Sequence, residues 1–136
     1  MKQTLQPGIS RTARIDIDRD RTIDFMGDEC RVYSTPDLVR DIEMTARDLL
    51  LEHSDPGEDS VGTRVAIDHL AATLLGMWVE IEVTVTGVKG RMVELEVGAR
   101  DALDQVARGS HNRFVVDVTT TAGRLRAKAE KAAGAE

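Results

Sequence analysis

The stretch from Met77 to Ala99 constrains the fold more than any other part of the sequence. Apolar and polar residues alternate on both sides of Lys89-Gly90, and the apolar set is Met77, Val79, Ile81, Val83, Val85, Val93, Leu95, Val97 and Ala99. Successive side chains of a strand point to opposite faces, so each half of this stretch has one buried and one hydrated face. The pattern predicts an antiparallel hairpin with a tight turn at Lys89-Gly90.

A long amphipathic helix is predicted over residues 34–53. Thr35 suits the N-cap position, and Pro36 suits the first helical position, where its missing N–H costs nothing. At about 100° per residue, Leu38, Ile42, Thr45 and Leu49 fall on one line along the helix, and the apolar residues Val39, Ala46 and Leu50 lie beside it. Glu43 falls at the rim of that apolar face.

Three further segments have the pattern of strands, namely residues 11–18, 64–71 and 105–118. The predicted order is a strand, a loop, the long helix and then four strands in an antiparallel meander. A single amphipathic helix must lie across one face of such a sheet. We therefore expect an α+β hotdog fold, in which one long helix packs on a curled antiparallel sheet of about five strands. We expect one domain over residues 1–121, followed by a charged, Ala-rich helix or tail over residues 122–136.

Composition excludes several classes of protein. The net charge of −6 and the aromatic share of 3% argue against a nucleic-acid binder, which needs a basic face or stacking platforms. A single cysteine, Cys30, allows no internal disulfide. No apolar run approaches the length that spans a bilayer, and the first ten residues lack the apolar core of a signal peptide. We expect a cytoplasmic protein that does not bind a membrane.

Four polar residues stand in or near positions where apolar residues are expected. His69 shares one strand face with Val65 and Ile67, Glu43 borders the apolar helix face, Thr35 starts the helix, and Arg113 lies in the last strand. If the helix packs on the sheet, His69 and Glu43 approach each other, and such a pair can activate water near neutral pH. The alternatives are a core histidine, a solvated glutamate and a simple cap. No cluster has metal-ligand spacing, so we expect no metal.

Three blocks of the sequence resemble a known family. They are YSTPDLVRDIEMTARDLL at residues 33–50, PGEDSVGTRVAIDHLAAT at 56–73 and GSHNRFVV at 109–116. Their order and spacing are similar to those of the fluoroacetyl-CoA thioesterase group of hotdog-fold thioesterases, over roughly residues 33–117. The resemblance implies an acyl-CoA thioesterase that hydrolyses a small or medium acyl-CoA to the free acid and CoA. It implies no cofactor, because coenzyme A is part of the substrate.

The resemblance also implies a site. Thr35, Glu43 and His69 fall on the family's catalytic threonine, glutamate and histidine, whereas Gly62 falls on the glycine whose N–H meets the thioester oxygen. Arg113 falls on the arginine associated with substrate and CoA binding. Glu43 would act as the nucleophile or as the base that activates water. Because the family's sites lie at a dimer interface, we expect a homodimer or a higher oligomer in which the partner chain contributes some of these groups.

One departure from the family concerns the acyl group. Met26 and Glu29 stand where the fluoroacetyl-specific enzyme has phenylalanines that form a lid, so we expect a different acyl group. The alternative functions are a non-catalytic acyl-CoA binding module, a hotdog dehydratase or hydratase acting on acyl thioesters, and a structural dimer without a small ligand. The intact Thr/Glu/His set favours the hydrolase, because a pure binder has no need of it.

Overall fold

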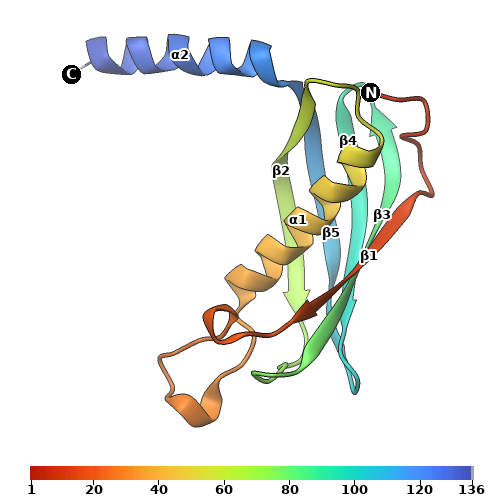
Figure 1. Cartoon of the computed structure of the whole chain (residues 1–136), viewed down its shortest axis with the longest axis vertical. Helices are drawn as coiled ribbons and strands as arrows, with labels where there is room; N and C mark the ends of the chain where they lie inside the picture. The colour runs from red at the N-terminus through yellow and green to blue at the C-terminus, as the bar shows by residue number, and fades with distance from the viewer. Residues whose placement is uncertain (136) are drawn as a thin grey trace.

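Five antiparallel strands curl around one long helix in the computed structural model of the chain, which describes residues 1–135 (Figure 1). The fold is the predicted α+β hotdog fold. The elements, in chain order, are β1 (Ser10–Asp16), α1 (Thr35–Glu52), β2 (Glu58–His69), β3 (Trp78–Lys89), β4 (Met92–Arg100), β5 (Gln105–Asp117) and α2 (Val118–Gly134). Two short 3-10 turns, Arg19–Arg21 and Asp28–Cys30, lie in the segment between β1 and α1.

The sheet has the strand order β1-β3-β4-β5-β2. β3, β4 and β5 form a meander, but the predicted meander of four consecutive strands is wrong, because β2 pairs with β5 and not with β3. The reason is that β1 already occupies the free edge of β3, with Ala13 opposite Ile81. The chain therefore crosses from β2 at one edge of the sheet to β3 near the other.

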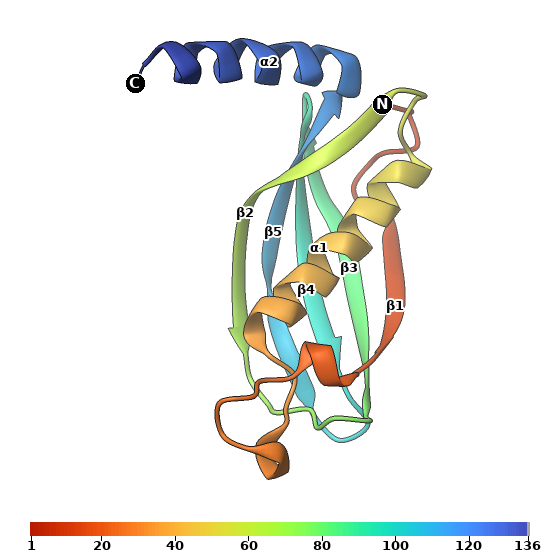
Figure 2. The same ribbon diagram turned by 60° about the vertical axis from the view of Figure 1, so that its left-hand side comes forward.

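The core lies between α1 and the concave face of the sheet (Figure 2). Leu38, Ile42 and Leu49 of α1 are at most 1% exposed and pack in one cluster with the inward residues of the central strands, such as Ile81 and Val83. Burial of each such side chain stabilises the fold by about 1.5–3 kcal/mol. The predicted alternation in residues 77–99 is confirmed from Val79 onward, whereas Met77 is exposed.

The start of α1 differs from the prediction. Ser34, not Thr35, is the N-cap, because its side chain accepts a hydrogen bond from the Asp37 N–H at 3.1 Å. Thr35 is the first residue of the helix itself. Since Ser34 caps the helix, the Thr35 hydroxyl remains available for a bond elsewhere.

A β-bulge in β2 decides which side chains face α1. The register against β5 shifts between Gly62 and Arg64, which leaves Thr63 as the extra residue. Gly62 and His69 are seven residues apart, so strict alternation would place them on opposite faces. Because of the bulge, Gly62 pairs with Arg113 and His69 pairs with Ala107, both of which face inward.

The chain ends in α2, whose helix begins at Val118 with Asp117 as N-cap. This start is four residues before the boundary expected from composition. No residue of α2 is buried, and Figures 1 and 2 show it projecting from one end of the sheet. No helix in the described part of the chain is long and apolar enough to cross a membrane.

Candidate active site

The predicted site residues all lie on the α1 side of the sheet, and they form two groups. Thr35 of α1 and His69 at the end of β2 form the first group. Glu43 of α1, Gly62 of β2 and Arg113 of β5 form the second.

The first group is joined by a hydrogen bond of 2.8 Å between Thr35 Oγ1 and His69 Nδ1. His69 Nε2 is buried and has no hydrogen-bond partner among residues 1–135. Burial lowers the pKa of His69, because it disfavours the charged imidazolium. The ring is therefore held neutral near pH 7, with its Nδ1 oriented by Thr35.

Tyr33 supports the first group, and sequence reasoning missed its role. Its ring lies edge-on to that of His69, with 6.4 Å between the centroids. Its hydroxyl donates to the buried Asp41 carboxylate at 2.5 Å, and Arg21 Nε donates to the same carboxylate at 2.9 Å. Burial, together with the Asp41 carboxylate, raises the pKa of Tyr33. The sequence did contain a sign of this buried carboxylate. Asp41 lies four residues before Thr45, which places both residues on the buried side of α1.

The second group brings a carboxylate against a strand. A side-chain carbon at Gly62 would collide with Glu43 Oε1 and would lie 3.2 Å from His111 Cε1, so any larger residue there would displace the Glu43 carboxylate. The Glu43 carboxylate is 3.9 Å from Arg113 Nη1, and its side chain is 38% exposed. This group therefore holds a half-exposed carboxylate directly over the backbone of β2.

Arg113 is buried beneath that carboxylate. Its Nε donates to Ser60 Oγ and its Nη2 to the Ser60 carbonyl, both at 2.8 Å. Its Nη1 lies 3.2 Å from His111 Nε2. In this structure the guanidinium therefore points at Glu43 and at the strands β2 and β5, and Arg113 as a whole is only 4% exposed.

His111 is the second residue that the sequence analysis did not single out. Its Nδ1 is 2.8 Å from the Arg64 carbonyl, which can only accept, so Nδ1 carries the proton and Nε2 accepts from Arg113. Burial, together with the Arg113 charge, lowers the pKa of His111 and keeps it neutral. The signal in the sequence was its position two residues before Arg113, which places both on one face of a strand.

The two groups are not in contact within one chain. Thr35 and Glu43 are eight residues apart, or about 12 Å along α1, and Gly62 and His69 are about 20 Å apart along β2. No hydrogen bond or ion pair joins Glu43 to His69 in the described part of the chain, so the expected approach of these two side chains is absent there. Both groups lie at β2, which is an edge strand.

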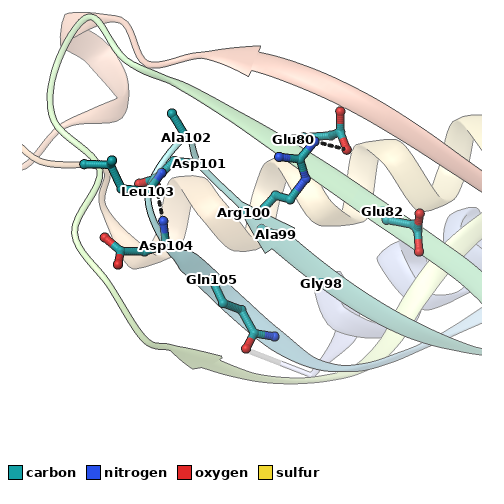
Figure 3. A pocket seen from close by; sticks show the side chains of 10 residues that line it. All are labelled: Glu80, Glu82, Gly98, Ala99, Arg100, Asp101, Ala102, Leu103, Asp104 and Gln105. Carbon is teal, nitrogen blue, oxygen red and sulfur yellow. Dashed lines mark hydrogen bonds and ion pairs between the residues drawn. The ribbon is translucent and has the colours of Figure 1, made fainter.

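A separate cavity contains none of the predicted residues. It has a volume of about 490 Å³ and opens on the outer face of the sheet, around Glu82, Gln105 and the turn at Asp101–Asp104 (Figure 3). Arg100 bridges part of it with a 3.1 Å bond to Glu80. Among residues 1–135, no group of His, Cys, Asp and Glu side chains is arranged to hold a metal ion.

Comparisons with known proteins identify the family and the fold of the chain. The family model described as fluoroacetyl-CoA-specific thioesterase matches residues 17–119. The fluoroacetyl-CoA thioesterase of Streptantibioticus cattleyicolor is 30% identical over 97 residues, which are 71% of this chain and 70% of that protein. A solved fluoroacetyl-CoA thioesterase superposes with a TM-score of 0.83 at 25% identity, covering 91% of this chain and 97% of that one. A thioesterase superfamily member from Thermus thermophilus has a TM-score of 0.87 at 23% identity, covering 98% and 99%, and shows the fold alone.

Proposed function

Because the chain belongs to the fluoroacetyl-CoA-specific thioesterase family, we propose that it hydrolyses a small or medium acyl-CoA thioester at a site shared between two subunits. The observation that carries this proposal is the division of the family's residues into two groups along the edge strand β2. Each group is incomplete alone. Thr35 and His69 lack a carboxylate, and Glu43 lacks a proton-transfer partner.

A homodimer through β2 would complete both sites. The free edge of β2 exposes Val61 and Val65, at 48% and 41%, although Val65 faces the α1 side. Antiparallel pairing of two β2 strands around a two-fold axis near Val65 would bring Gly62 of one subunit opposite His69 of the partner subunit. The same pairing would satisfy the open backbone groups of the edge strand. The dimer would then contain two identical sites.

Each group has a role in the proposed reaction. The Glu43 carboxylate attacks the thioester carbon, or it removes a proton from a water that does so. The Gly62 N–H stabilises the negative charge that develops on the carbonyl oxygen. When water attacks, the neutral imidazole of His69 from the partner subunit receives the proton that Glu43 takes from the water and passes it to the CoA sulfur as the C–S bond breaks. When Glu43 attacks, CoA leaves as the thiolate, and His69 takes the proton of the water that hydrolyses the anhydride and passes it to that thiolate. Thr35 orients the imidazole in both routes. The products are the free acid and CoA.

Arg113 and His111 would act on Glu43 from beneath. The guanidinium lies 3.9 Å from the Glu43 carboxylate and would hold it in place over β2 by its charge. His111 fixes the guanidinium through its neutral Nε2. We also propose an acyl group other than fluoroacetyl, since Met26 and Glu29 replace the family's lid phenylalanines and both are exposed.

The test is thiol release from a panel of short, branched and aromatic acyl-CoAs, followed with a disulfide dye. We expect release with at least one acyl group and its loss in Glu43→Ala. No release across the panel would exclude the hydrolase and favour a binding module. A single turnover in ¹⁸O-labelled water distinguishes the two roles of Glu43. Label in the Glu43 carboxyl would show an anhydride with the enzyme, because direct attack by water on the thioester labels only the product acid.

A further inference from the structure

α2 has no partner within its own chain. Every residue from Arg124 to Ala135 is exposed, and the contacts of the helix are confined to its first turns. An isolated helix of this length is marginal in water, because most helical stability in proteins comes from packing of an apolar face. A helix that projects from the body in this way is therefore expected to pack on another surface.

The sequence of α2 supplies an apolar face for such a contact. Apolar residues recur at spacings of four, three, four and three, at Val118, Ala122, Leu125, Ala129 and Ala132. This is the heptad spacing of a packed helix seam, and the side chains of Val118 and Leu125 are 50% and 60% exposed. The rest of the helix combines small and threonine residues with four cations (Arg124, Arg126, Lys128 and Lys131) and one acid, Glu130. The surface that suits α2 is therefore apolar with an acidic border.

The position of α2 indicates where that surface lies. Figures 1 and 2 show the helix leaving the end of the sheet where β5 ends and β2 begins, and running out past the edge strand β2. In the dimer proposed above, the partner's β2 runs antiparallel along this edge. The end of the partner that reaches α2 is thus the opposite end of the sheet. A helix of 17 residues is about 25 Å long, which is enough to extend over several strands of the partner.

That opposite end carries an apolar and acidic surface. Residues 17–34, which join β1 to α1 and are called here the loop lobe, lie at the end of the sheet away from α2 (Figure 1). In the loop lobe, Phe25 is 77% exposed and Met26 is 56% exposed. Asp20, Asp24 and Glu29 are also exposed, and none has an ion-pair partner among residues 1–135.

We propose that α2 packs on the loop lobe of the partner subunit, with its apolar seam on Phe25 and Met26 and its cations beside the free carboxylates. The inference rests on the dimer of the proposed function. The loop lobe leads directly into Thr35, whose hydroxyl binds His69. Each α2 therefore covers the mouth of the acyl site that contains the partner's Thr35 and contributes to the choice of acyl group.

Chemical cross-linking tests this contact, because the loop lobe contains the native Cys30, which is exposed and is the chain's single cysteine. The probe is a short bismaleimide added to two full-length variants. Ala129→Cys places a thiol on the apolar seam, whereas Ala127→Cys places one on the opposite side of the same helix. We expect several-fold more dimer cross-linking from Ala129→Cys than from Ala127→Cys or from the unmodified chain, and we expect Cys30→Ser to abolish it.

Three outcomes would overturn the proposal. Equal yields from the two variants would mean that the seam does not face the partner. Cross-linking of Ala129→Cys that persists in the Cys30→Ser background would mean that two α2 helices pair with each other. No dimer cross-link from Ala129→Cys would mean that α2 does not reach the lobe. None of these results depends on thiol release, so failure of this proposal is distinct from failure of the proposed chemistry.

Discussion

Substituting Gly62 by alanine should lower activity by about 10²-fold while leaving the fold intact. The new methyl carbon would occupy the space of Glu43 Oε1, and the next closest atom, His111 Cε1, would be 3.2 Å away. The carboxylate is the end of a flexible, half-exposed side chain, so it can swing aside at a cost of about 1 kcal/mol or less in the free energy of unfolding. A displacement of about 1 Å at a reacting group costs about 10²-fold in rate, so we expect kcat to fall by about that factor.

Gly109 provides the matched control, because it lies in the neighbouring strand β5 and is also tightly packed. A methyl group there would collide with the backbone carbonyl of Ala66, which cannot move without distorting β2. We expect Gly109→Ala to lower the free energy of unfolding by about 1–3 kcal/mol or more. Urea titration and thiol release are measured on both variants. A Gly62→Ala enzyme with unchanged kcat, or one that is as unstable as Gly109→Ala, would refute the reasoning.

Further predictions concern the charges of the site. Glu43→Gln should lower kcat by about 10³-fold or more in the thiol-release assay, because an amide can neither attack nor accept the proton. Because burial lowers the pKa of His69, kcat/KM should rise with pH through an inflection below about 6.5, and His69→Ala should remove that inflection. The pKa of His111 is also lowered by burial, so below about pH 6.5 the unfolded chain binds a proton that the folded chain does not. The free energy of unfolding should therefore fall as the pH is lowered below about 6.5, by up to about 1.4 kcal/mol per unit from this histidine, and His111→Gln should reduce the slope in urea titrations. Tyr33→Phe should cost about 1–3 kcal/mol in the same titrations, because the buried Asp41 loses a donor; no loss would mean that the bond contributes little.

Much of the fold was predictable because alternation and helical periodicity act locally. The hairpin of β3 and β4 and the apolar face of α1 follow directly from spacing. The position of β2 was not predictable in this way, since the choice between an edge of β3 and an edge of β5 depends on where β1 pairs. That pairing is a non-local contact with no signature in either strand.

The sequence predicted which residues belong to the site better than it predicted how those residues are arranged. The Thr35 hydroxyl can bind His69 because Ser34 serves as the N-cap of α1. Serine and threonine both suit an N-cap, so the sequence alone did not show which of the two residues caps the helix. The inward orientation of Gly62 depends on the bulge at Thr63, which reverses the alternation expected of a regular strand. The distance between Glu43 and His69 could not be seen from spacing, because their proposed meeting involves two chains.

A mixing experiment tests the shared site most directly. Glu43→Ala and His69→Ala homodimers should each be inactive. In a mixed dimer, the intact Glu43 of one subunit meets the intact His69 of the other, so one of the two sites is complete. After subunit exchange of equal amounts, about half of the dimers are mixed and thiol release should recover to about a quarter of the wild-type rate. If the mixture stays as inactive as its parents although sedimentation shows that mixed dimers have formed, then the catalytic groups do not come from two subunits and the account is wrong.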